Sequence, residues 1–190
     1  MNTYTTYETS TILTVAGKVL DAINQLPELL KDHNLALPTE YSDTQKGGYL
    51  SLYRRNPFIK SGELLLLAKI GEIPDIDDAD FGSKNEKYQK YTGKKSRALI
   101  YEPGITTSEK TTLGIKGGIV INDDLVLSFS GRTELEDQLL VVVTTLVCKQ
   151  FFYDTNAVNA SNIFKLESIQ GENPFLSKDI VNTVARYCAT

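Results

Sequence analysis

The sequence has very few of the side chains that build metal and nucleophilic sites. Histidine occurs once, at His33, and cysteine twice, at Cys148 and Cys188. A single histidine excludes a zinc site with several histidine ligands, and two cysteines so far apart in sequence are poor zinc ligands. A histidine-based triad would have to use His33, and no G-x-S-x-G motif is present. Two cysteines do not form a disulfide framework, so we expect buried thiols in a reducing cytosol.

Phosphate loops and membrane segments are also missing. Neither G-x-x-x-x-G-K-[ST] nor G-x-G-x-x-G occurs, so the sequence carries no signature of nucleotide binding. The first residues contain no basic region followed by an apolar run, and we therefore expect no signal peptide. The longest apolar runs, near 64–68 and 139–143, are far shorter than the roughly 20 residues that cross a bilayer. These absences predict a cytoplasmic protein with no membrane partner.

Length and composition favour a single soluble domain over residues 1–190. The hydrophobic fraction of 41% and the charged fraction of 23% are ordinary for a globular protein with a real core. The net charge of −4 would repel phosphate backbones as well as anionic membranes. This balance argues against a dedicated nucleic-acid binder, although a local basic patch could override it.

Apolar residues at three- and four-residue steps predict three main helices. The first runs from Thr9 to about Leu30, although Pro27 could end it or begin a second short turn. His33 follows as an exposed C-terminal cap. The second follows a T-x-x-E capping box formed by Thr133 and Glu136. The third begins at about Pro174 and forms a helical extension after about residue 152.

Two hairpins are predicted between these helices. The first pairs strands near 35–42 and 49–55, and the second joins "GGIVIN" to "LVLSFSG" around the turn at 122–124. "ELLLLAKIGE" is interpreted as a short buried helix, "RALIYE" as a strand, and 71–112 as a polar insertion on the surface. Strands in hairpins predict an α+β fold, with a mainly antiparallel sheet and helices packed on one face.

The segment from Gly117 to Val147 resembles the GlcG/haem-binding-protein superfamily. The resemblance rests on a Gly-Gly pair before an apolar strand, a second strand that ends in Ser-Gly, and an acidic helix start. In this chain these features are Gly117-Gly118, Ser130-Gly131 and Asp137, whereas Gln138 stands where many of those relatives have a histidine. The resemblance implies a profilin-like sandwich, ring-like homo-oligomers and, in some members, binding of haem or another small ligand. Haem ligation would have to use His33, a cysteine, Met1 or a tyrosine, so no cofactor is identified.

The same segment contains a candidate site for a small anionic ligand. A glycine before a helix start leaves backbone donors at a positive dipole end, where an anion can bind. Arg132 could add charge there, together with Arg54 or Arg55 from the neighbouring hairpin, while Asp137 would hold the turn or pair with an arginine. The candidate ligand-binding residues are Arg54, Arg55, Gly117, Gly118, Ser130, Gly131, Arg132, Thr133 and Asp137. The alternative, which the pattern favours, is that the glycines serve only turns and packing.

Three functions remain open on the sequence alone. The first is a non-enzymatic small-ligand-binding or scaffold protein that acts as a homo-oligomer, with no catalytic residue and no metal. The second is an enzyme that acts on a small anionic metabolite, with carboxylates for catalysis and Arg54 or Arg55 as anion clamps. The third is nucleic-acid binding through the basic and aromatic segment 84–101. The carboxylates at 75–80 do not match the spacing of a calcium loop.

Overall fold

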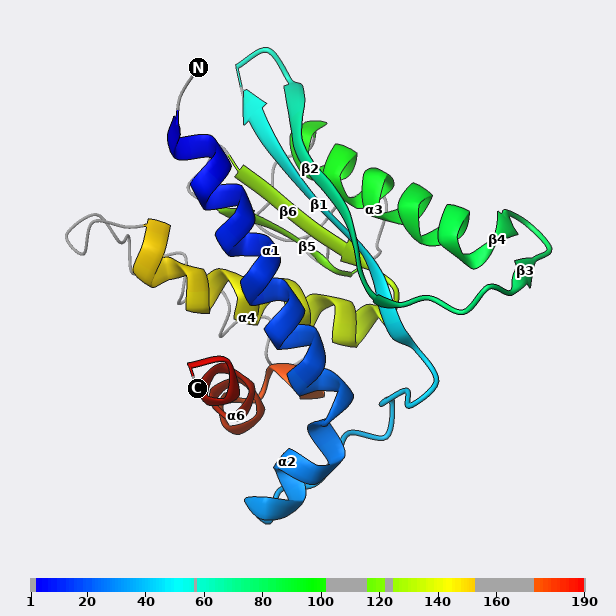
Figure 1. Ribbon diagram of the computed structural model, residues 1–190, viewed down its shortest axis with the longest axis vertical. Coiled ribbons are helices and arrows are strands. Elements are labelled where there is room, and N and C mark those ends of the chain that lie inside the picture. Colours follow the sequence, from blue (N-terminus) through cyan, green and yellow to red (C-terminus); the bar gives the residue numbers. More distant parts are fainter. Residues whose placement is uncertain (1–2, 57, 102–115, 122–124, 153–172, 190) are drawn as a thin grey trace.

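The fold is built around a four-stranded sheet in the order β2-β1-β6-β5 (Figure 1). The computed structural model describes residues 3–56, 58–101, 116–121, 125–152 and 173–189. The strands of this sheet are β1 (Lys46–Asn56), β2 (Ser61–Glu72), β5 (Gly118–Ile121) and β6 (Leu125–Ser130). All their pairings are antiparallel, and β1 joins the two hairpins because it pairs with both β2 and β6. The predicted α+β class with an antiparallel sheet is confirmed.

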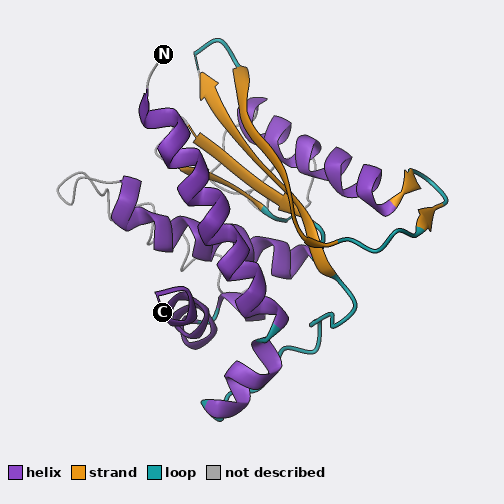
Figure 2. Ribbon diagram, in the orientation of Figure 1, coloured by secondary structure: helices purple, strands orange, loops and turns teal. Residues whose placement is uncertain are grey.

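Helices cover both faces of the sheet (Figure 2). They are α1 (Thr3–Asn24), α2 (Leu26–Asp32), α3 (Lys84–Tyr101), α4 (Glu134–Phe152), the 3-10 turn η1 (Pro174–Leu176) and α6 (Lys178–Ala189). On β1, Leu50 and Leu52 join the core formed with α1 and α4, while Ser51 between them hydrogen-bonds to Ser96 of α3. The expectation that helices pack on one face is therefore wrong. Successive side chains of β1 point to opposite faces of the sheet, and helices pack against both faces.

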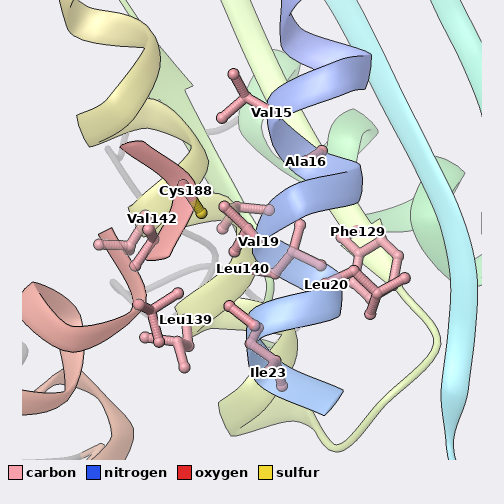
Figure 3. Close-up of a cluster of buried hydrophobic side chains, with 14 of the residues drawn as sticks. Val15, Ala16, Val19, Leu20, Ile23, Phe129, Leu139, Leu140, Val142 and Cys188 are labelled. Carbon is pink, nitrogen blue, oxygen red and sulfur yellow. The ribbon is translucent and has the colours of Figure 1, made fainter. Parts of the chain in front are cut away.

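The main core lies between the sheet and the layer of α1, α4 and α6. Figure 3 shows α1 side chains, among them Val19 and Ile23, against Leu139 and Leu140 of α4. Phe129 of β6 and Cys188 of α6 close the cluster from two sides, and all of these residues are buried. The apolar stripe predicted for the first helix is confirmed as the face that packs into this core.

Local pattern misassigned three segments. The leucine, alanine and lysine residues of β2 favour a helix, but this prediction is wrong, because pairing with β1 along its whole length fixes the segment as a strand. Residues 35–42 form no strand, and β1 takes its hairpin partner from the following segment instead. The described part of "RALIYE" continues α3 as a helix.

The predicted polar insertion contains regular structure. Its first two residues belong to β2, and a small hairpin of β3 (Asp77–Asp78) and β4 (Gly82–Ser83) then leads into α3, which packs on the sheet. Residues 102–112 of the insertion, and 153–172 of the predicted C-terminal extension, lie outside the described residues. The predicted first helix is divided at Gln25 into α1 and α2, because Pro27 begins a new helix, and the exposed His33 caps α2. None of the helices in the described ranges combines the length and apolar content that crossing a bilayer requires.

Candidate functional site

The end of β6 and the start of α4 form a polar corner, which we call the β6–α4 corner (residues 130–137). Thr133 Oγ1 donates to Glu136 Oε2 at 2.8 Å, and the backbone N–H of Thr133 donates to the same oxygen at 3.2 Å. In return, the backbone N–H of Glu136 donates to Thr133 Oγ1 at 3.4 Å. This reciprocal arrangement confirms the predicted capping box and explains why α4 begins at Glu134.

Thr133→Ala should lower the free energy of unfolding by about 1 kcal/mol, because an N-cap side chain typically contributes that much. Thr145 is a matched control on the same helix, since its hydroxyl donates only to the carbonyl oxygen of Val141 one turn earlier. We expect Thr145→Ala to change stability much less. Urea denaturation monitored by circular dichroism would measure both, and equal losses in the two variants would contradict a specific role for the cap.

Arg132 points into the protein from this corner. Its Nη2 donates to Glu136 Oε1 at 2.8 Å, and neither side chain is exposed to solvent. The guanidinium also donates to Asn24 Oδ1 and to the carbonyl oxygens of Ser42 and Gln45. Arg132 therefore ties the start of α4 to the end of α1 and to the loop before β1. Both terminal nitrogens of this guanidinium are thus occupied by protein acceptors, and only its buried Nε has no hydrogen-bond partner among the described residues.

Asp137 forms a second buried ion pair, with Lys95 of α3. Lys95 Nζ lies 2.8 Å from Asp137 Oδ2 and donates to the carbonyl oxygen of Phe129 at 2.8 Å. The backbone N–H of Arg132 donates to Asp137 Oδ1 at 2.9 Å. Only 1% of the Lys95 side chain and 2% of the Asp137 side chain are exposed. The pair links α3 to α4 across the end of β6.

Gly117 is required beside this ion pair. Its φ of +108° lies in a region that side chains rarely adopt. A Cβ atom there would lie 2.7 Å from the Cβ of Asp137 and 2.8 Å from Lys95 Nζ. The first glycine of the Gly-Gly pair therefore makes room for the buried charges, which is a packing role.

Burial raises the pKa of Asp137 from 3.8 to about 6, and the neighbouring Lys95 opposes this rise. The folded state therefore takes up this proton before the unfolded chain does as the pH falls. Asp137 contributes stability that is fully present below about pH 3.8 and is lost as the pH rises through about 6.

We therefore expect the difference in unfolding free energy between the wild type and Asp137→Asn to change between pH 6 and pH 4. The wild type should gain relative to the variant as the pH falls, because the amide does not titrate. Urea denaturation at several pH values would measure the difference. A difference that is constant over this range would contradict the raised pKa.

Ser130 and Gly131 mark a close approach of two backbones. Ser130 pairs with Tyr49 at the end of the β1–β6 ladder. A Cβ atom on Gly131 would lie 2.3 Å from the carbonyl oxygen of Gly47 and 2.4 Å from the Cα of Gly48. The space beside Gly131 is therefore filled by protein. Gly118 is buried at the start of β5, where it pairs with Ser128.

The two arginines of β1 are not brought to the β6–α4 corner. Arg54 pairs with Leu125, at the opposite end of β6 from Ser130. Arg54 lies 3.7 Å from the exposed Glu63, while Arg55 donates to the carbonyl oxygen of Leu99 at 2.9 Å. The predicted clamp of Arg132 with Arg54 or Arg55 is therefore not formed.

The inward face of α3 carries polar residues that the sequence pattern does not reveal. Besides Lys95 it carries Ser96, whose hydroxyl hydrogen-bonds to Ser51 and to Ser128, each at 2.9 Å. Thr92 donates to the carbonyl oxygen of Tyr49 at 3.0 Å. The spacing of the buried residues along α3 is helical, but their polarity concealed the pattern. The buried residues are Tyr88, Thr92, Lys95, Ser96, Leu99 and Ile100.

The outward face of α3 carries the remaining basic side chains of the segment 84–101. Lys90 and Arg97 are exposed, whereas Tyr88 and Lys95 face inward and are not available for a nucleic acid. Lys87 Nζ lies 2.8 Å from Asp78 Oδ2, so part of the basic charge neutralises an aspartate of the preceding hairpin.

Among the described residues, no group of three or more histidine, cysteine, aspartate or glutamate side chains could hold a metal ion. Comparison of the chain with protein-family models, with curated proteins and with solved structures gives no match. The four buried charges at the β6–α4 corner form two pairs, Lys95–Asp137 and Arg132–Glu136, in which each charged group already has a protein partner.

Proposed function

We propose that this chain is a non-enzymatic scaffold or binding protein that acts as a homo-oligomer through its β1–β2 hairpin. The observation that carries the proposal is a set of exposed apolar side chains on this hairpin. Phe58 is 94% exposed and Ile59 is 70% exposed, both near the tip. Leu64 and Leu67 on β2 are 48% and 39% exposed. Large apolar side chains exposed on one hairpin favour an interaction with another protein, because solvent-exposed apolar surface is buried at such sites.

The position of β2 at the edge of the sheet also supports self-association through this hairpin. β2 is an edge strand, and within the described residues no strand pairs with its outer side. A β-bulge interrupts its register opposite Leu52 and Tyr53, which disfavours a continuous ladder with another strand. We therefore propose that a second copy packs on the exposed side chains of this hairpin, in a self-complementary contact.

The charged corner supports a non-enzymatic role. Its ionisable groups are buried and paired, whereas a nucleophile or general base must reach a substrate. The enzyme alternative needs Arg54 or Arg55 as an anion clamp, and Arg54 lies beside Glu63. Membership of the GlcG-like superfamily, with its profilin-like sandwich, is part of this proposal. It is supported by the order of the motif residues along the elements, with Gly117 before β5, Ser130 at the end of β6 and Asp137 in the first turn of α4.

Leu64→Lys should reduce the native mass of the protein to that of a monomer, because a buried lysine in an apolar contact lacks a counter-charge. Asn182→Lys is the matched control, since it adds the same charge at an exposed position of α6. Light scattering coupled to size exclusion would measure the mass, with circular dichroism to verify folding. A monomeric wild type, or an unchanged oligomer in folded Leu64→Lys, would overturn this proposal.

A further inference from the structure

A cavity of about 610 Å³ lies between α1, α4 and α6, apart from the β6–α4 corner. Its volume is within the range of small-molecule sites, which is about 300–1,000 Å³. Val15 and Cys188, which belong to its wall, are seen in Figure 3. The cavity is lined by Ser10, Thr11, Thr14, Val15, Lys18, Leu146, Val147, Ala185, Cys188 and Ala189.

The wall of this cavity is mainly apolar. Val15, Leu146, Val147 and Ala185 contribute aliphatic side chains from three different helices. The thiol of Cys188 belongs with them, because burial raises its pKa to about 11 and keeps it uncharged near neutral pH. An apolar chain could therefore replace water along this wall without leaving a buried charge unpaired.

The lining of the cavity carries a single charge. Lys18 is the one charged residue among the described residues that line the cavity, and it is exposed. Its Nζ donates to the carbonyl oxygen of Cys188 at 3.4 Å, which places the ammonium beside the cavity wall. An ammonium has three donors, so this contact leaves capacity for an anionic oxygen.

We propose that this cavity binds an aliphatic carboxylate, with the hydrocarbon chain between α1, α4 and α6 and the carboxylate at Lys18. A single lysine matches one negative charge, whereas phosphate groups are usually held by several donors or by forked arginines. The binding site uses none of the residues of the self-association surface. The proposal is therefore independent of the homo-oligomer.

Calorimetric titration of the full chain with octanoate, decanoate and dodecanoate, each below its micelle concentration, tests this site. Affinity should rise by about fourfold for each methylene added, until the chain fills the cavity. Dodecanol should bind more weakly than dodecanoate, because it has no charge for Lys18. Ala185→Leu should weaken every member of the series by narrowing the cavity.

Lys18→Met tests the role of the charge without changing the shape of the cavity, since methionine is also a long side chain and position 18 is exposed. We expect it to weaken dodecanoate by about threefold to fivefold, as for an exposed ion pair. The affinity for dodecanol should not change, so the variant should bind dodecanol and dodecanoate with similar affinity. Lys31→Met, on the exposed side of α2, makes the same change in net charge and should leave both ligands unaffected.

Three results would overturn this proposal. The first is the absence of saturable binding by the wild type. The second is affinity that does not depend on chain length. The third is equal weakening of dodecanoate in Lys18→Met and Lys31→Met, which would indicate a general charge effect. Lys18 is exposed, so its variant tests the site even where Ala185→Leu does not fold.

Discussion

Lys95→Met should lower the free energy of unfolding by about 3–5 kcal/mol at pH 8, because it leaves a buried carboxylate without its counter-charge. Asp137 is 2% exposed and would keep one hydrogen bond, from the backbone N–H of Arg132. The loss should be smaller at pH 5, since the pKa of Asp137 is already raised to about 6 and a neutral carboxyl needs no counter-charge. Urea denaturation at the two pH values would measure both effects.

Lys94→Met is the matched control for this experiment. Lys94 is the adjacent residue on α3, and its ammonium lies 4.9 Å from the ring centre of Tyr91. Its loss should cost far less than that of Lys95. The double variant Lys95→Met/Asp137→Leu should recover much of the stability, because replacing both charges by apolar groups leaves neither unpaired. Equal losses in Lys94→Met and Lys95→Met would show that the buried pair does not stabilise the fold.

Arg132→Ala should also lower the free energy of unfolding by about 3–5 kcal/mol, since Glu136 would be left buried without its partner. The carbonyl oxygens of Ser42 and Gln45 would lose a charged donor at the same time. Arg132→Lys should recover only part of this loss, because an ammonium cannot reproduce the fork of a guanidinium. Thermal and urea denaturation would rank the three proteins.

Arg186→Ala provides the control for the arginine series, since Arg186 is exposed on α6. It should change the unfolding free energy by less than about 0.5 kcal/mol, as for an ordinary surface substitution. If Arg132→Ala is as stable as the wild type, Arg132 does not hold the β6–α4 corner together. The sequence-based prediction that Arg132 binds a ligand would then be the remaining explanation for its burial. A large loss would show that this arginine holds the β6–α4 corner together.

The sequence by itself determined the features that depend on near neighbours in the chain. The apolar stripe of the first helix, the hairpin of β5 and β6, and the final helix follow from spacing that can be counted along the chain. The turn of the second hairpin, at 122–124, lies outside the described residues. The capping box is the clearest case in the candidate site, since Thr133 and Glu136 are three residues apart and interact directly.

The tertiary structure alone decided which distant groups meet. Lys95 and Asp137 are 42 residues apart, and Arg132 reaches Asn24 across 108 residues, so no local pattern pairs them. The identity of β2 as a strand likewise depends on its ladder with β1, which overrides helix propensities of less than about 1 kcal/mol per residue. The polar face of α3 points inward because the sheet offers Ser51, Ser128 and the Phe129 carbonyl as partners. Polar groups can be buried without a large cost only where hydrogen-bond partners are present. The positions of these partners are set by the packing of the whole chain.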